Sequence, residues 1–459
     1  MSGRVASTVR RVTSSMRRPW GGTRGPDEPP VVRGWIPFLG CALPFGRDSP
    51  AFLRRCQERH GSAFSLYLLG RRMTFLLDPR DYPLVFKNAH ALSFTPIAQE
   101  ISTRAFGYTT LYRSGLREEQ LRETYVRHLR PGSMGPLAER TRRELARVVA
   151  EHVAALPVRA DGSREADLLE LVSRSVFEAG VVAMFGRGPV DKSLHDTFVR
   201  YDRYFAKLVA GVPPRLLGTA GRDRDAMVDL LRPPWPEASA FIEERRALLA
   251  RYVDDVEAAR VRLSMLWASQ ANTIPAAFWA VAYLLEHPVA CAAIRAEVDE
   301  AVRDPDGDRP QPRLDAAILE VLRLCAGGTT IRAVIEPLTL ELHGGHRCAL
   351  RPGDNVAVFP FLSHRDPQIF ADPEVFQAER FLSTERGARQ FKKDGQRLGF
   401  ALMPFGGGET MCPGRFLAQS EMKGLVTLLL PISKGSTWGW TSSTTLSLFV
   451  VSVAPAGAL

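Results

Sequence analysis

The chain has 459 residues, of which 45% are hydrophobic and 24% are charged, an ordinary composition for a globular protein with a large core. Its net charge of +10 is spread along the chain and comes largely from arginine, with no basic block interleaved with aromatic residues. This pattern excludes a dedicated nucleic-acid binder and favours an acidic partner protein or an anionic membrane surface. The cysteines form no Cys-x-x-Cys pair, so we expect a reducing compartment rather than a zinc site or disulfide scaffold.

Residues 1–28 are predicted to be a disordered basic tail. Arginines recur before residue 25, and no acidic residue precedes Asp27, a composition that fits an organelle transit peptide equally well. The chain holds no charge-free apolar run of about 18 residues, the length that a membrane-spanning helix needs. We therefore expect no spanning helix and, at most, a peripheral contact with a membrane.

The first globular segment is predicted to combine one helix with two strands. A stiff, extended stretch at 34–40 precedes a helix at 50–60. Apolar and β-favouring residues then cluster at 63–69 and 73–77, with a turn at Gly70-Arg71.

From about residue 117 to 300 the apolar spacing is mostly helical, with breaks at Pro131-Gly132, at 186–189 and at Pro233-Pro234. The segment 205–217 is apolar, interrupted by glycine and proline, and carries Lys207 and Arg215. A packed loop and a loop that dips into a membrane surface both fit this composition.

A long helix at 255–285 is predicted to carry a kink. Pro275 has no N–H for the carbonyl of Ala271, and its ring pushes against that turn. The freed carbonyl, with Asn272 and Thr273, makes a polar notch suited to a diatomic molecule and an ordered water. The alternative is a proline-bent helix whose polar side chains only satisfy hydrogen bonds.

A shorter helix at 314–324 carries Glu320 and Arg323, which share a face and can form an ion pair. An exposed pair of this kind contributes little to stability. Arg380, in a segment rich in phenylalanine, is a candidate third member of the cluster.

A glycine-rich loop then presents Cys412 ahead of a helix. Gly406, Gly407 and Gly408 lack a Cβ and allow close approach of a bulky group, and Pro413 suits the first helical position. Peptide dipoles at a helix N-terminus favour a thiolate over a thiol. Haem iron needs such a thiolate from an axial cysteine, whereas a buried free cysteine is the ordinary alternative.

Phe405, Gly408, Cys412 and Gly414 form the pattern Phe-x-x-Gly-x-x-x-Cys-x-Gly, which resembles the haem-binding loop of the cytochrome P-450 superfamily. The chain order of three further residues resembles that superfamily's buried Glu-Arg-Arg network. These residues are Glu320, Arg323 and Arg380.

Residues from about 31 to 430 resemble the sterol-hydroxylating branch of that superfamily, with the cholesterol and oxysterol 7α-hydroxylases and, more distantly, prostacyclin synthase. Residues 267–275 match the branch's Trp-Ala-Ser-Gln-Ala-Asn-Thr-Ile-Pro signature. The runs at 75–79, 85–88 and 92–94, and Thr-Thr-Ile-Arg at 329–332, resemble the oxysterol 7α-hydroxylase in particular.

The resemblance implies one mainly helical domain with small β-sheets at 29–430, holding haem b on Cys412. The other haem-contacting candidates are Phe405, Gly406, Gly408, Gly414 and Arg332, whose guanidinium can bind a propionate. It also implies molecular oxygen, electrons from NADPH through a flavoprotein reductase, and the endoplasmic reticulum membrane. The implied reaction is 7α-hydroxylation of 25- or 27-hydroxycholesterol and related steroids, in bile acid and cholesterol metabolism.

Several positions depart from the superfamily pattern. Asn272 stands where an acid is usual, so proton delivery is expected to run through Thr273 and solvent. Thr410 replaces an arginine, and no Trp-x-x-x-Arg occurs in the helical region, which leaves Arg127 or His128 as candidates for a second propionate contact. A basic patch including Arg415 and Lys423 is our candidate reductase surface.

The two ends also depart from the pattern, so the fold is expected to be incomplete at both. No membrane anchor precedes residue 29, and the composition of 431–459 is unlike the family's closing strands. Two alternatives to a sterol monooxygenase remain: a haem-thiolate isomerase of the prostacyclin synthase type, motivated by Asn272, and a truncated inactive variant.

Overall fold

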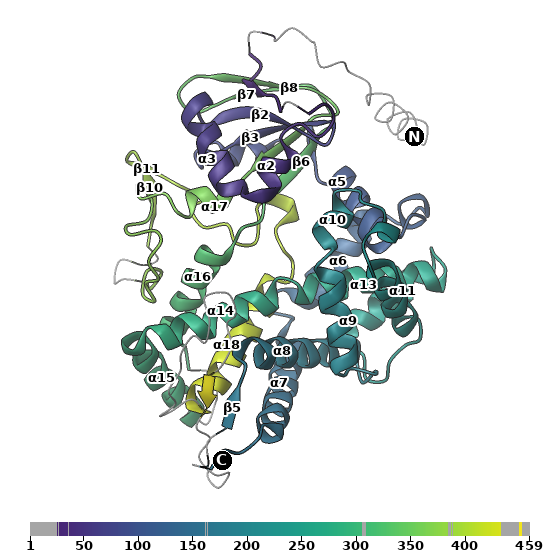
Figure 1. Cartoon of the computed structure of the whole chain (residues 1–459), viewed down its shortest axis with the longest axis vertical. Helices are drawn as coiled ribbons and strands as arrows, with labels where there is room; N and C mark the ends of the chain where they lie inside the picture. The colour runs from purple at the N-terminus through teal and green to yellow at the C-terminus, as the bar shows by residue number, and fades with distance from the viewer. Residues whose placement is uncertain are drawn as a thin grey trace. The chain divides into compact units, whose positions relative to one another are not determined.

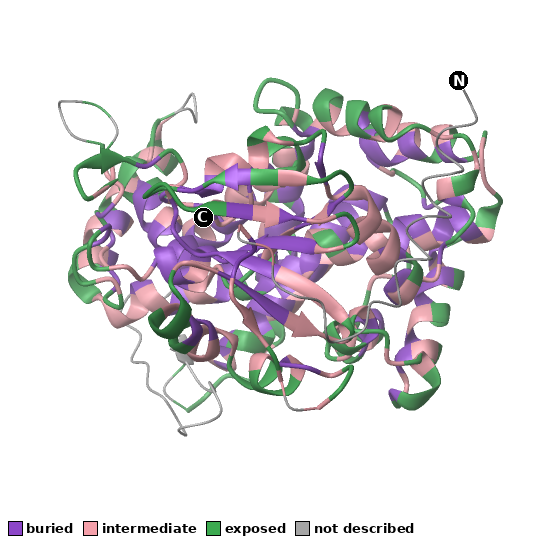
Figure 2. Cartoon of the chain, turned by 90° about the horizontal axis from the view of Figure 1, so that it is seen from above, coloured by how far each residue is buried: buried purple, intermediate pink, exposed green. Residues whose placement is uncertain are grey.

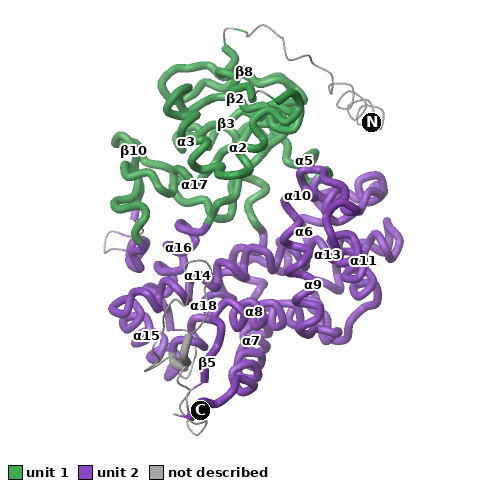
Figure 3. The backbone as a smooth tube through the Cα atoms, viewed as in Figure 1, with its two compact units in different colours: residues 1–100, 326–375, 390–412 green, residues 101–325, 376–389, 413–459 purple. Residues whose placement is uncertain are grey.

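The computed structural model describes residues 25, 27–34, 36–160, 162, 164–304, 309–383, 387, 389–432 and 449–451. The predicted basic tail and the atypical carboxyl-terminal segment therefore lie mostly outside the described residues. The chain forms two compact units (Figure 3). The first comprises 1–100, 326–375 and 390–412, and the second 101–325, 376–389 and 413–459.

A six-stranded sheet organises the first unit, in the order β1-β2-β3-β9-β6-β4. The two predicted strands are confirmed, at 63–68 and 71–76. The turn between them lies at Leu69-Gly70, one residue earlier than predicted, with Gly70 in the left-handed region at φ +77°. The strands are β1 (Val31–Val32), β2 (Ala63–Leu68), β3 (Arg71–Leu76), β4 (Leu92–Ser93), β6 (Thr330–Val334) and β9 (Asn355–Val358).

Both faces of this sheet are covered, and its central strands are largely buried (Figure 2). On one face Phe64 and Phe75 stack with ring centroids 6.1 Å apart, beside buried Leu53 of the predicted helix. The helices of the unit are α2 (Ala42–Arg47), α3 (Ser49–His60), α4 (Tyr82–Lys87), most of α5 (Thr95–Ile101) and α17 (Pro360–Ser363). Two hairpins complete it: β7 (Leu338–Glu341) with β8 (Arg347–Leu350), and β10 (Lys392–Lys393) with β11 (Gln396–Arg397).

The second unit is helical (Figure 1), and its core contains α8 (Leu168–Phe185), most of whose residues are buried. This helix packs on α7 (Gly135–Ala155) and on α14 (Thr273–Glu286), which also contacts α18 (Arg415–Ile432). The remaining helices are α6 (Glu118–Leu129), α9 (Lys192–Asp202), α10 (Phe205–Val209), α11 (Ala220–Leu231), α12 (Ala240–Leu249), α13 (Asp255–Gln270), α15 (Pro288–Arg303) and α16 (Pro312–Cys325).

Short elements connect these helices: the π-helical turn η1 (Ser102–Phe106) and the 3-10 turns η2 (Leu111–Arg113) and η3 (Pro214–Leu216). Strand β5 (Arg164–Ala166) pairs antiparallel with β12 (Phe449–Val451), the last described segment of the chain. The expected fold class, mainly helical with small sheets, is confirmed.

Two predicted boundaries change in the structure. The helix predicted at 255–285 consists of α13 and α14, separated by a turn at Ala271 and Asn272, because Pro275 cannot donate to the carbonyl of Ala271. The placement of Pro413 at the first helical position was wrong. The last helix begins at Arg415, after a turn formed by Pro413 and Gly414.

Among the described residues, no single helix is long and apolar enough to cross a membrane. One bent pair, residues 255–286 with 288–303, meets the length and composition requirements together, with an angle of 112° between its two parts.

Candidate functional site

The loop before α18 holds Cys412 in a closed turn. The amide of Cys412 donates to the carbonyl of Phe405 over 3.0 Å, which fixes the residues between them. Gly406 and Gly408 adopt φ values of +72° and +70°, a left-handed conformation that residues with a Cβ rarely adopt. The cysteine itself is half-buried.

Four of the other cysteines are chemically unlike a metal ligand. Burial raises the pKa of Cys41, Cys56 and Cys291, and raises that of Cys348 to about 12. These side chains therefore remain neutral thiols at physiological pH, and the thiolate is the form that binds metal.

The middle glycine of the loop lies against an aromatic ring. A Cβ on Gly407 would lie 2.9 Å from two ring carbons of Phe86, closer than real Cβ atoms approach carbon. Phe86 is itself packed against Phe400, with ring centroids 5.0 Å apart. The loop backbone thus passes so close to Phe86 that a Cβ at position 407 would force one of the two to shift.

Arg332, on β6, links the sheet to this loop. Its Nη2 donates to the carbonyl of Gly407 over 3.2 Å and to the hydroxyl of Thr410. Its guanidinium also lies over the rings of Phe86 and Phe94, at 5.5 and 5.7 Å from their centroids. Burial lowers the pKa of Arg332, whose guanidinium nevertheless stays charged because its ordinary value is so high.

His364 contacts the cysteine loop, and nothing in the sequence indicated this contact. This residue is fully buried, and its Nε2 accepts a hydrogen bond from the amide of Met403 over 2.9 Å. It thereby fixes the start of the cysteine loop. No periodic pattern predicts a bond between residues 39 positions apart.

In the second unit, the structure brings together Glu320, Arg323 and Arg380. Arg323 donates to both carboxylate oxygens of Glu320 over 2.8 Å, and Nε of Arg380 lies 3.0 Å from each of them. The amide of Gln377 adds a fourth donor at 3.1 Å. Glu320 and Arg323 are fully buried, so each charge depends on the others, and loss of one partner leaves an uncompensated ion.

The turn between α13 and α14 carries the other two predicted site residues. Thr273 is buried and Asn272 is exposed, and the carbonyl of Asn272 accepts from the amide of Ala276 over 3.3 Å. Asn272 makes no side-chain capping hydrogen bond to α14, so its side-chain amide does not cap the helix.

Four further candidate side chains already have partners in the second unit. Arg127 and His128, on α6, both contact the carboxylate of Glu244. Lys423 lies 2.8 Å from Asp315, and the guanidinium of Arg415 lies over the ring of Phe416 at 4.2 Å. Of the three propionate candidates, Arg332 donates a hydrogen bond to the cysteine loop, whereas Arg127 and His128 contact Glu244.

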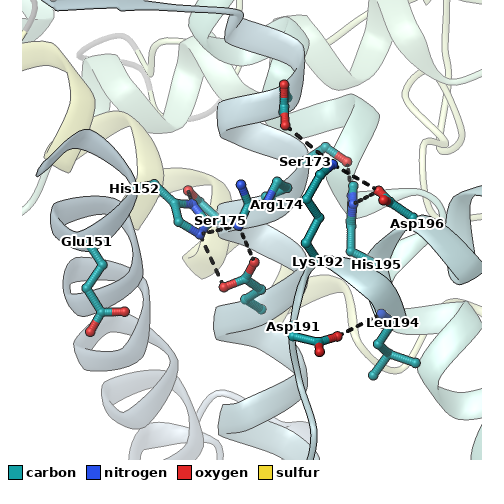
Figure 4. A network of polar contacts seen from close by, with 12 residues as sticks. Glu151, His152, Ser173, Arg174, Ser175, Asp191, Lys192, Leu194, His195 and Asp196 are labelled. Atoms are coloured by element: carbon teal, nitrogen blue, oxygen red, sulfur yellow. Dashed lines mark hydrogen bonds and ion pairs between the residues drawn. The ribbon is translucent and has the colours of Figure 1, made fainter. Parts of the chain in front are cut away.

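A second polar network joins α7, α8 and α9 (Figure 4). The hydroxyl of Ser173 lies 2.7 Å from Nε2 of His195, and Nδ1 of His152 lies 3.1 Å from the hydroxyl of Ser175. Both serines are buried, so these Ser–His pairs bind the three helices together rather than present a nucleophile. Burial lowers the pKa of His195, which keeps its ring neutral.

The residues of the loop fit a haem held by thiolate. One half-buried cysteine, a Cβ-free backbone that allows close approach and an adjacent guanidinium are the groups that such a cofactor requires. Across the described ranges no three His, Cys, Asp or Glu side chains gather as a metal site, so the single cysteine is the ligand to consider.

Comparison with known proteins identifies the class. The family model for cytochrome P450 matches residues 29–217 and 237–431. The solved structure of a retinoic-acid-bound cyanobacterial CYP120A1 aligns with a TM-score of 0.71 at 20% identity, covering 94% of this chain and all of that one. The chain therefore belongs to the cytochrome P450 family.

Within that family, the similar curated proteins are sterol hydroxylases. Mouse cytochrome P450 7B1 is 34% identical over 435 residues, covering 89% of this chain and 84% of its own length. Pig cytochrome P450 7A1 and the cholesterol 7-alpha-monooxygenase of Cricetulus griseus are each 33% identical, covering 89% of this chain and 86% of their own. The predicted relation to the sterol 7α-hydroxylase branch is confirmed.

Proposed function

We propose that this protein is a haem-thiolate monooxygenase that hydroxylates oxysterols, such as 25- or 27-hydroxycholesterol, and related steroids at the 7α position. The observation that carries the proposal is the closed loop of Cys412, joined to the similarity to sterol 7α-hydroxylases. Haem b, when bound, supplies the iron at which molecular oxygen is activated.

The chain's own residues divide this work. Cys412 would supply the thiolate that binds the haem iron, and the loop from Phe405 to Gly414 would shape the surface around it. Arg332, held by the loop carbonyl of Gly407, is placed to pair with a propionate. The Glu320 cluster stabilises the fold of the second unit through hydrogen bonds from four donor atoms to one buried carboxylate.

Proton delivery is assigned to Thr273 and an ordered water. A hydroxyl both donates and accepts, so Thr273 can pass a proton without changing its own charge. Asn272 can hold the water in place, because its amide can donate and accept and its side chain does not cap α14. It has no carboxyl proton to give, so the proton must come from solvent.

We further propose that the protein acts on the surface of the endoplasmic reticulum membrane, receiving electrons from an NADPH-dependent flavoprotein reductase. The segment 205–217 supports a membrane contact: Leu216 is 69% exposed, and the neighbouring Arg215 and Lys207 are also exposed. An apolar tip flanked by cations suits an anionic lipid surface. Arg415 and Lys423 remain the candidate contacts for the reductase.

The test begins with the optical spectrum of haem-loaded protein. The reduced carbonyl complex should absorb as a thiolate-ligated haem, and Cys412→Ala should abolish that band. Incubation with reductase, NADPH and 25-hydroxycholesterol should then yield a 7α-hydroxylated product. A normal thiolate spectrum without any sterol product would refute the substrate assignment but leave the class intact.

A second candidate is a haem-thiolate isomerase that rearranges a lipid endoperoxide, and the specific observation in its favour is Asn272. A rearrangement uses oxygen already present in its substrate and needs neither a proton-donating acid nor a reductase. Turnover of an endoperoxide without NADPH would support this candidate, whereas strict dependence on NADPH would exclude it.

A further inference from the structure

One face of α13 and the turn after it is accessible although the helix is otherwise mostly buried. Ala268, Asn272 and Pro275 are exposed, and Trp267 and Ala271 are partly so. Their spacing of three and four residues places them along one side of the helix. Ala268 and Ala271 lie between Trp267 and the turn at Asn272, and their small side chains leave a flat strip on which an apolar ligand can lie.

The upstream end of this strip is aromatic. The indole of Trp267 stacks on the ring of Phe205, from α10, with centroids 3.6 Å apart and planes 15° apart. Phe106, from η1, packs on both, at 5.9 and 5.7 Å between centroids. Phe106 is stacked in turn on Tyr108 at 6.3 Å. These rings give the strip a rigid apolar end wall.

A single carboxylate interrupts this aromatic wall. Oδ1 of Asp202, the last residue of α9, accepts a hydrogen bond from Nε1 of Trp267 over 2.7 Å. No other donor and no cation pairs with Asp202 among the residues that the structure describes. Burial raises the pKa of this carboxyl, although the indole hydrogen bond opposes the shift. A partly buried carboxylate with one donor has capacity for another.

We propose that Asp202 binds a hydroxyl group of the substrate at a position remote from the carbon that is oxidised. This inference rests on the proposed sterol substrate and makes Asp202 a specificity-determining residue for it. A sterol is apolar except for its hydroxyls, so its ring system suits the alanine strip and one hydroxyl suits the carboxylate. Trp267 precedes Asn272 by five residues, about 7.5 Å of helix rise, which is shorter than a sterol, so one sterol can contact both.

The physical consequence is discrimination between sterols. A hydrogen bond to a charged group contributes more than one between neutral groups, and the ligand that lacks the donor leaves the carboxylate unpaired. The loss should amount to about tenfold in the dissociation constant or more. If Asp202 only oriented Trp267, its replacement would weaken the binding of all sterols by the same factor.

The experiment measures sterol binding by the Soret shift of haem-loaded protein, for the wild type, Asp202→Leu, Asp202→Asn and Trp267→Phe. Three ligands are compared: 25-hydroxycholesterol, cholesterol without the side-chain hydroxyl, and the 3-ketone of 25-hydroxycholesterol without the donor at C3. Asp229→Leu, whose native side chain is 74% exposed on α11, is the matched control.

We expect Asp202→Leu to weaken 25-hydroxycholesterol binding at least about tenfold and to leave unchanged the binding of whichever ligand lacks the recognised hydroxyl. Asp202→Asn, which can still accept a hydrogen bond, should lose less. Equal losses for all three ligands, matched by Trp267→Phe, would overturn the inference in favour of a structural role. Unchanged binding of all three would overturn it as well. If no sterol shifts the wild-type spectrum, the sterol substrate itself fails, and this inference fails with it.

Discussion

Glu421, on α18, should make the protein less stable as pH rises, and Glu421→Gln should remove that loss. The carboxyl group is buried, and its Oε1 has no hydrogen-bond partner among the described residues. It faces Gly180 of α8, where a Cβ would lie 2.8 Å from Oε1 of Glu421 and 2.7 Å from Nε2 of Gln270. Burial raises the pKa of Glu421 to about 8, so the folded protein holds this proton at neutral pH.

The size of the effect follows from linkage. In the unfolded chain the same group ionises near its ordinary pKa of 4.5, so the unfolded state gains stability as pH rises while the folded state does not. The stability provided by the neutral acid is complete below pH 4.5 and is lost progressively up to about pH 8. Each pH unit in that window costs about 1.4 kcal/mol, so by pH 7 the loss is at most about 3.5 kcal/mol.

Denaturant unfolding at several pH values measures this loss. The free energy of unfolding of Glu421→Gln should diverge from that of the wild type between pH 5 and pH 8, in favour of the variant, because glutamine stays neutral throughout. Glu58→Gln, at an exposed position of α3, should follow the wild type. Parallel curves for Glu421→Gln and the wild type would refute the conclusion that a neutral acid is buried there.

Three other substitutions test the packing and the ion pairs. Gly407→Ala should reduce haem occupancy several-fold, because the added Cβ would lie 2.9 Å from the ring of Phe86. The ratio of Soret to protein absorbance measures this occupancy, and adding Phe86→Leu should restore part of it. An unchanged ratio in Gly407→Ala alone would contradict the clash. Arg380→Ala should cost about 3 kcal/mol of unfolding free energy, since Glu320 loses one of two buried cations, and a cost below about 1 kcal/mol would show that Arg323 suffices. Burial lowers the pKa of His195, so the stability contributed by its neutral ring should be lost as pH falls below about 6.5. In thermal melts at several pH values, His195→Gln should lose less stability than the wild type over that acidic range. Identical losses in the two proteins would contradict this prediction.

The sequence predicted the features that spacing encodes. The two strands around Gly70, the helices at 50–60 and 314–324, and the break in helical regularity near Ala271, expected as a kink in one long helix, all depend on local periodicity or on proline chemistry. The proximity of Glu320 and Arg323 is likewise a consequence of helical repeat. The cysteine loop was identifiable because its glycines stand at fixed intervals.

The contacts that the sequence did not predict join residues far apart in the chain. Arg332 was expected to face a cofactor, yet its protein partners lie 75 and 78 positions away, in the cysteine loop. His364 and Glu421 gave no signal, because burial of a single polar side chain leaves no periodic trace. The start of the last helix was misplaced at Pro413 because proline is common both in turns and at the first position of a helix.

The close packing of Phe86 on Gly407 couples two positions that are 321 places apart in the chain, and this coupling has an evolutionary consequence. A Cβ at position 407 would force it or the ring at position 86 to shift, whereas a smaller residue at position 86 would release the constraint. Across related sequences the two positions should therefore vary together, with substitutions of the glycine confined to lineages that first lost the ring. The order in which such changes can accumulate is set by the geometry of one loop.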